Sequence, residues 1–74
     1  MSDGALTPEQ TGRVVAIALD LAREGDTRQL AAFVDHGLPV DAADPEANTL
    51  LMLAAYHGHA ATVRALLARG ANPD

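Results

Sequence analysis

The amino-acid sequence predicts an all-α protein built from stacked helix-turn-helix repeats, with a short loop or hairpin between the repeats. Its 74 residues are enough for one small domain. Hydrophobic residues make up 49% of the chain but aromatic residues only 3%, so the core must consist mainly of alanine and leucine on closely packed helices. An internal repeat, and glycines that end helices at matching places in both copies, support this fold class.

The internal repeat has an offset of 33 residues and needs no gap, since segment 17–41 aligns with segment 50–74. The identical pairs are Ala22 and Ala55, Gly25 and Gly58, Ala32 and Ala65, Gly37 and Gly70, and Asp41 and Asp74. Apolar residues coincide along both copies as well. We therefore expect the two segments to fold alike.

The first helix is expected to run from Pro8 to about Arg23. The sequence TPEQ at residues 7–10 is a capping box with proline at the first helical position. An apolar stripe follows at helical spacing, formed by Val14, Ala18, Leu21 and Ala22. Residues 1–7 are predicted to be a disordered N-terminal tail.

The second helix of the first copy is expected from Thr27 to His36. Asp26 is a good N-cap for it, because a side-chain carboxylate can accept a hydrogen bond from the first helical turn. Gly25 separates the two helices, and Gly37 can adopt the left-handed conformation that ends the second one. This pattern predicts a helical hairpin.

The second copy predicts a second hairpin. Thr49 can cap a helix from Leu50 to His57, which Gly58 ends. A last helix is expected from Ala60 to Arg69, followed by Gly70 in the left-handed position. We expect this last helix to bury Val63, Leu66 and Leu67 and to expose Arg64 and Arg69. Small residues that should let the paired helices approach closely are Ala54 and Ala55.

Composition and charge exclude several classes of function. The chain has no cysteine, so it has neither disulfides nor thiolate metal sites. Its net charge is −5, and its five basic residues are scattered arginines, which argues against a nucleic-acid partner and suits a partner with a basic patch. The sequence shows no secretory signal, no membrane-spanning run and no phosphate-binding loop, so we expect a cytoplasmic protein with no cofactor and no membrane partner.

The 33-residue period, with a helical hairpin and a connecting loop in each unit, resembles the ankyrin repeat, an α-solenoid of stacked helical hairpins. Residues that fit the family pattern are Thr49, Leu51, Ala54, Ala55, Gly58, His59, Val63, Leu66, Leu67, Gly70, Ala71 and Asn72. The resemblance implies a degenerate, capping-like repeat over residues 8–41 and a second repeat over residues 42–74.

Two departures from the family pattern stand out. The usual Thr-Pro-Leu-His becomes Thr-Leu-Leu-Met at residues 49–52, and Ala47 occupies the place of a glycine at the tip of the hairpin loop. Alanine tolerates a positive φ poorly, so we expect the geometry of this loop to differ.

The resemblance implies a non-catalytic protein–protein interaction module whose partner is another protein. Loop tips and the exposed ends of the first helices carry the partner surface in this family. By position, these residues are Tyr56, His57, Pro45, Glu46, Asn48, Arg23 and Glu24. Residues with an implied structural role are Gly25, Gly37, Thr49, Gly58, His59 and Gly70. An alternative is a structural N-terminal cap of a longer array whose binding surface lies elsewhere.

A remote alternative is a small metal-binding enzyme that uses His57 and His59. A zinc site needs three or four converging ligands, and we expect the turn between the helices to point these two imidazoles apart. No nucleophile–base pair is suggested, because serine occurs only at residue 2. The interpretation therefore contains no catalytic and no metal-binding residue.

In a stack of repeats, each unit buries one face against the unit before it and another against the unit after it. We expect parts of Leu51, Val63 and Leu67 to meet water on the side that a third unit would cover. The chain is therefore expected to be the N-terminal portion of a longer protein, with downstream repeats, or to self-associate through this open face.

Overall fold

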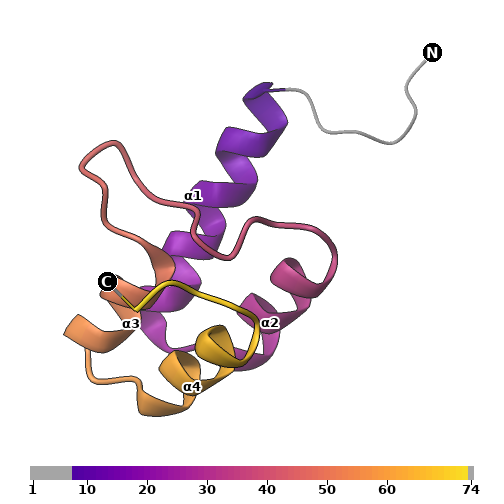
Figure 1. Cartoon of the computed structure of the whole chain (residues 1–74). Helices are drawn as coiled ribbons and strands as arrows, with labels where there is room; N and C mark the ends of the chain where they lie inside the picture. The colour runs from indigo at the N-terminus through magenta and orange to yellow at the C-terminus, as the bar shows by residue number, and fades with distance from the viewer. Residues whose placement is uncertain (1–7, 74) are drawn as a thin grey trace.

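Four helices make up the computed structural model of this chain, which describes residues 8–73. They are α1 (Pro8–Glu24), α2 (Thr27–Asp35), α3 (Leu50–Tyr56) and α4 (Ala60–Ala68) (Figure 1). The described residues contain no strand, and a single antiparallel bridge pairs Ala43 with Thr49. The all-α prediction is confirmed. The tail predicted for residues 1–7, and the first residue of the predicted capping box, lie outside the described residues.

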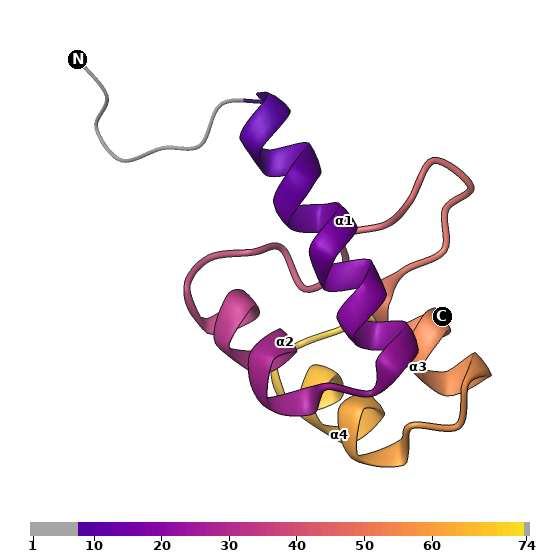
Figure 2. The same ribbon diagram turned by 180° about the vertical axis from the view of Figure 1, so that it is seen from behind.

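The helices form two hairpins that stack on each other. Helix α1 packs on α2 and α3, and helix α4 packs on α2 and α3. Figures 1 and 2 show from opposite sides that the first half of α1 extends beyond the other helices. The second hairpin therefore covers one side of the first.

Local signals explain where the helices begin. The side chain of Asp26 accepts a hydrogen bond from the backbone N–H of Gln29, and that of Thr49 accepts one from Met52. These caps satisfy donors that the first helical turn leaves free. Every helix begins at the predicted residue and ends within one residue of the predicted end.

The two hairpins also end alike. Gly37 and Gly70 have φ angles of 114° and 94°. The next residue in each copy donates to a carbonyl five residues back, with Leu38 bonded to Phe33 and Ala71 bonded to Leu66 at 3.0 Å. The two copies, which are 33 residues apart in the sequence, therefore end with the same backbone structure.

Alanine and leucine form the core, as predicted. Its buried apolar residues are Ala18, Leu19, Leu21, Ala22, Leu30, Leu38, Leu50, Leu51, Ala54, Leu66 and Ala71. The prediction that Leu51 meets water is wrong, because α3 packs against both α1 and α4 and leaves Leu51 only 7% exposed. Ala55 is exposed, so of the two predicted contact alanines only Ala54 is buried.

The buried face of α4 is rotated from the predicted one. Leu66 is 1% exposed, but Val63 is half-buried and Leu67 is 42% exposed. The prediction that α4 buries Leu67 is therefore wrong, whereas the expectation that parts of Val63 and Leu67 meet water is confirmed. Thr62 lies in the core instead, and its hydroxyl is 2.6 Å from that of Thr27. The hydrogen bond between the hydroxyls makes a buried threonine tolerable at the α2–α4 contact.

Arg69 is half-buried rather than exposed, which corrects a second expectation for this segment. Its Nε and Nη2 donate to the two carboxylate oxygens of Asp35 at 2.9 and 3.1 Å. This pair raises the pKa of Arg69, and the same hydrogen bonds hold the pKa of Asp35 below its ordinary value. The arginine thus joins the second hairpin to the end of α2.

Candidate protein-binding surface

His59 connects the two hairpins. It is the N-cap residue of α4, but its side chain makes no capping hydrogen bond there. Its Nε2 lies 2.7 Å from the backbone carbonyl oxygen of Arg23 in the first hairpin. The ring rests on Gly25, where an added Cβ would lie 2.5 Å from Nδ1 of His59. The side chain therefore acts across the contact between the two units.

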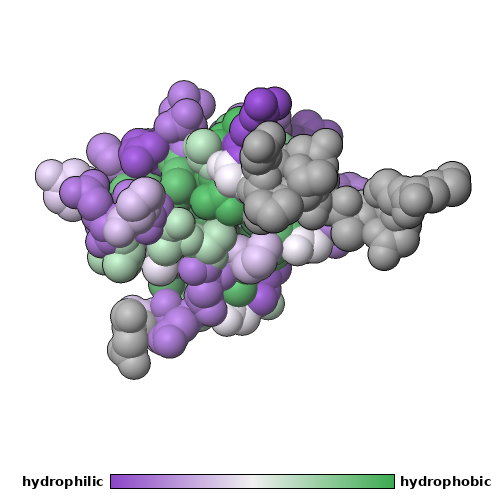
Figure 3. All heavy atoms as spheres, turned by 90° about the horizontal axis from the view of Figure 1, so that it is seen from above, coloured by the Kyte–Doolittle hydropathy of each residue, from purple (hydrophilic) through white to green (hydrophobic). Residues whose placement is uncertain are grey.

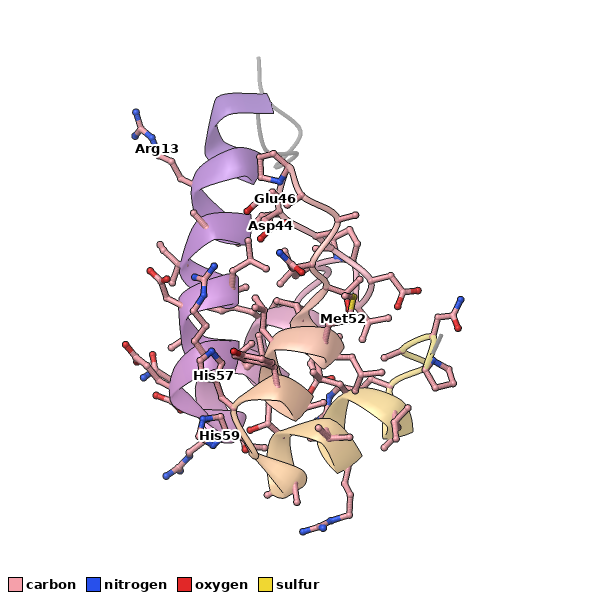
Figure 4. The ribbon with its side chains drawn as sticks, turned by 90° about the vertical axis from the view of Figure 1, so that its left-hand side faces the viewer. Arg13, Asp44, Glu46, Met52, His57 and His59 are labelled. Carbon is pink, nitrogen blue, oxygen red and sulfur yellow. The ribbon has the colours of Figure 1, made fainter. Side chains whose placement is uncertain are left out.

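His57 is exposed and lies beside His59. The two ring centroids are 6.3 Å apart and the ring planes differ by only 23°, so the prediction that the imidazoles point apart is wrong. Gly58 between them has a φ of 77°, and this turn brings both rings to the same side of the molecule, next to α1 (Figure 4). Within residues 8–73, no three His, Asp or Glu side chains converge on a possible metal position.

Tyr56 is the most exposed large hydrophobic residue of the described part of the chain, at 84%. Its ring meets that of His57 edge to face, with centroids 5.1 Å apart and planes at 90°. Beside these rings an open groove follows α3. Its lining consists of Asn48, Met52, Leu53, Ala55, Tyr56 and His57.

The hairpin loop before α3 is held by Asp44. Its Oδ1 accepts hydrogen bonds from the backbone N–H groups of Glu46 and Asn48, both at 2.9 Å. Its Oδ2 accepts one from the Asn48 side chain at 3.0 Å. These bonds, above all those from Asn48, hold the pKa of Asp44 below its ordinary value. They also hold Ala47 at a φ of 68°, so the loop has a left-handed tip although alanine stands where the family has glycine.

The predicted partner residues therefore differ in their exposure and in whether they are already bonded within the chain. Pro45 and Glu46 are exposed at the loop tip, whereas Asn48 is half-buried and bonded within the loop. At the end of α1, Arg23 and Glu24 are exposed. Nη1 of Arg23 lies 2.8 Å from Oδ1 of Asp20. Figure 4 shows Asp44 and Glu46 above the two histidines on the same side of the molecule.

Comparison with known proteins identifies the fold. Residues 46–74 match the family model of the ankyrin repeat. A Pseudomonas aeruginosa protein named as an ankyrin repeat protein is 46% identical over 55 residues, which cover 74% of this chain and 32% of that protein. The chain belongs to the ankyrin repeat family. It spans about a third of that relative's length, and no solved structure matches it.

Within this ankyrin chain, sequence reasoning missed Met52 as a surface residue. Its side chain is 48% exposed and lines the groove along α3. The sequence spacing could have predicted this, because Met52 lies three residues before Ala55 and four before Tyr56 and so shares their helix face. Figure 3 shows from above that apolar surface is exposed between polar residues on this small molecule. No helix of the described ankyrin units is long and apolar enough to cross a membrane.

Proposed function

We propose that this chain is a non-catalytic protein–protein interaction module that binds its partner through Tyr56 and His57. Ankyrin repeat proteins generally act by binding other proteins, and the exposed Tyr56 ring supports the position of the site. At 84% exposure, this ring contributes little to the stability of the isolated chain. It can bury almost its full area on a partner.

The geometry of the pair favours binding. A tyrosine offers a large apolar face and one hydroxyl with few rotatable bonds, which is why it is enriched among residues that dominate interfaces. The edge-to-face contact with His57 favours one orientation of the Tyr56 ring before a partner arrives. Less conformational freedom is then lost on binding.

Charged residues around the pair can set specificity. Glu46 on the loop tip and Glu24 at the end of α1 are both exposed. Together with the net charge of −5, they favour a partner that presents basic side chains around an apolar or aromatic centre. Such charges mainly affect the rate of association and the choice of partner.

To test this, the chain is immobilised and used to capture a partner from a total protein extract, and the partner is then purified. Calorimetry compares its affinity for the unchanged chain with that for Tyr56→Ala and His57→Ala, with Arg64→Ala on α4 as control. Tyr56→Ala should lose on the order of 2 kcal/mol of binding free energy. An equal loss in all three variants, or none in Tyr56→Ala, would reject this surface.

A further inference from the structure

The tip of the hairpin loop, defined here as residues 44–48, is closed by backbone and side-chain hydrogen bonds. The backbone N–H of Asp44 donates to the Asn48 carbonyl oxygen at 3.0 Å, and that of Ala47 donates to the Asp44 carbonyl oxygen at 2.9 Å. The Asp44 carboxylate accepts three further hydrogen bonds within the tip. Pro45 fixes its own φ angle through its ring. The tip therefore has little conformational freedom left to lose when a partner binds.

Ala47 is the strained residue of this tip. Its φ of 68° makes it the one non-glycine residue with a positive φ within residues 8–73. A residue with a Cβ is disfavoured in this conformation, whereas glycine adopts it freely. A glycine at this position would relieve the strain, but it would also allow the unbound loop more conformations. A strained residue kept at the tip of an exposed loop points to a function that needs one fixed shape there.

Glu46 carries the carboxylate that this fixed tip presents to solvent. The residue is exposed, and its carboxylate makes no ion pair or hydrogen bond within residues 8–73. Its backbone N–H is bonded to Oδ1 of Asp44 at 2.9 Å, so the backbone at this position is held in place. Both carboxylate oxygens of Asp44, by contrast, already accept hydrogen bonds from the loop. Glu46 is therefore the acid of the tip that can pair with a cation of a partner.

The end of α1 faces the loop and is acidic as well. Asp20 and Glu24 are exposed there, and the one basic residue among residues 20–24, Arg23, is already paired with Asp20 at 2.8 Å. Hydrogen bonds from the residue at position 48 lower the pKa of Asp44 most, and the positive charge of Arg23 adds to this effect. Acidic groups on both sides of the surface therefore favour a partner with positively charged side chains.

We propose that the tip is a pre-shaped recognition element for an extended, arginine-containing segment of the partner, in which Glu46 selects the arginine and Ala47 fixes the position of Glu46. This role rests on the proposed function, because it concerns the partner that binds beside Tyr56. Asn48 at the base of the tip and Tyr56 line the same groove, so one segment can reach both. Arginine fits better than lysine, since its planar guanidinium can donate two parallel hydrogen bonds to one carboxylate.

To test this, peptides that bind the whole chain are selected from a displayed library of random linear peptides, and should be enriched in arginine. The tightest peptide is synthesised, and fluorescence anisotropy measures its Kd for each variant. Glu46→Gln should raise the Kd about two- to fivefold, as for one lost exposed ion pair. Replacing the arginine of the peptide by glutamine should abolish this difference between the two proteins.

Asp26→Asn is the matched control for charge. It removes the same charge and can still cap α2, and it lies at the turn between α1 and α2, far from the loop tip in Figures 1 and 2. Its Kd should equal that of the unchanged chain. Ala47→Gly should raise the urea midpoint and yet raise the Kd about two- to fivefold, because the unbound loop then has more conformations to lose. A purely structural loop would gain stability without losing affinity.

Three results would each overturn the proposal: selected peptides without an excess of arginine, equal Kd values for Glu46→Gln and Asp26→Asn, or unchanged affinity in Ala47→Gly. Tyr56→Ala, measured with the same peptide, separates this role of the tip from the proposed function. If Tyr56→Ala loses affinity and the two loop variants do not, only the role of the tip is rejected. If the loop variants lose affinity and Tyr56→Ala does not, the role of the tip is supported and Tyr56 is rejected as the centre of the site.

Discussion

Gly25 and Gly58 form a natural pair for measuring what the His59 contact contributes to stability. Their φ angles are 76° and 77°, so an alanine at either position is strained to the same degree, at a cost of roughly 1–2 kcal/mol. Only at Gly25 does the added Cβ meet another side chain. It would lie 2.5 to 2.8 Å from three atoms of the His59 ring, and real Cβ atoms do not approach that closely.

Gly25→Ala must therefore displace the imidazole as well as strain the backbone. The displaced ring loses its 2.7 Å bond to the Arg23 carbonyl, a bond worth about 1 kcal/mol net, and also loses packing. We expect Gly25→Ala to cost roughly 2–4 kcal/mol and Gly58→Ala roughly 1–2 kcal/mol. This difference is large for a domain whose total stability is on the order of 5 kcal/mol.

The assay is urea denaturation at 25 °C, followed by circular dichroism, with a stabilising osmolyte present in all samples so that the weakest variant still folds. A double-mutant cycle identifies the cause. In a His59→Ala background the clash is absent, so Gly25→Ala should then cost the same as Gly58→Ala. Equal costs of the two glycine variants in the unchanged background, within about 0.5 kcal/mol, would refute the inter-unit role of His59.

Three further predictions follow from local geometry. Ala47→Gly should stabilise the chain by up to about 1 kcal/mol in the same urea assay, because it relieves an alanine held at a φ of 68°. Thr27→Val and Thr62→Val should each cost about 1–2 kcal/mol by leaving one hydroxyl unpaired, while the double variant should cost less than their sum. The lowered pKa values of Asp35 and Asp44 mean that their stabilising effect is complete above the unfolded pKa near 3.9. That effect should disappear as the pH falls through the lower folded values, and urea midpoints measured against pH should lose this dependence in the double Asp→Asn variant.

The helices were predictable because their ends are determined locally. A side chain such as Asp26 or Thr49 caps the backbone of its own first turn, and a glycine such as Gly37 ends a helix through its own φ angle. Neither signal needs knowledge of distant residues. The internal offset then predicted that the same hairpin occurs twice.

The buried face of α4 was not predictable in the same way. Hydrophobicity favours Leu67 over Thr62 as a core residue, yet Leu67 is 42% exposed and Thr62 is 1% exposed. The hydroxyl of Thr27 decides this, since it supplies the hydrogen bond that a buried threonine requires. Thr27 lies 35 residues earlier in the chain, so no local pattern could indicate the pairing.

The hairpin loop shows a local rule overridden by a nearby side chain. Alanine is disfavoured at positive φ, but Asp44 accepts three hydrogen bonds around the tip and thereby stabilises the loop that places Ala47 there. Sequence reasoning placed Asn48 on the partner surface without recognising that its side chain is one of these donors. Within the predicted site, Pro45 and Glu46 are therefore the freer loop residues.

The two neighbouring histidines acquire different roles from one backbone turn. Gly58, with its φ of 77°, directs His57 and His59 to the same side of the chain, where α1 ends. His59 lies against Gly25 because that residue has no side chain, and its imidazole is thereby committed to the contact between units. His57 has no such contact with the first hairpin's glycine and stays exposed, its ring perpendicular to that of Tyr56. A glycine in the preceding repeat thus explains why His59 lies between the two units while His57 stays exposed.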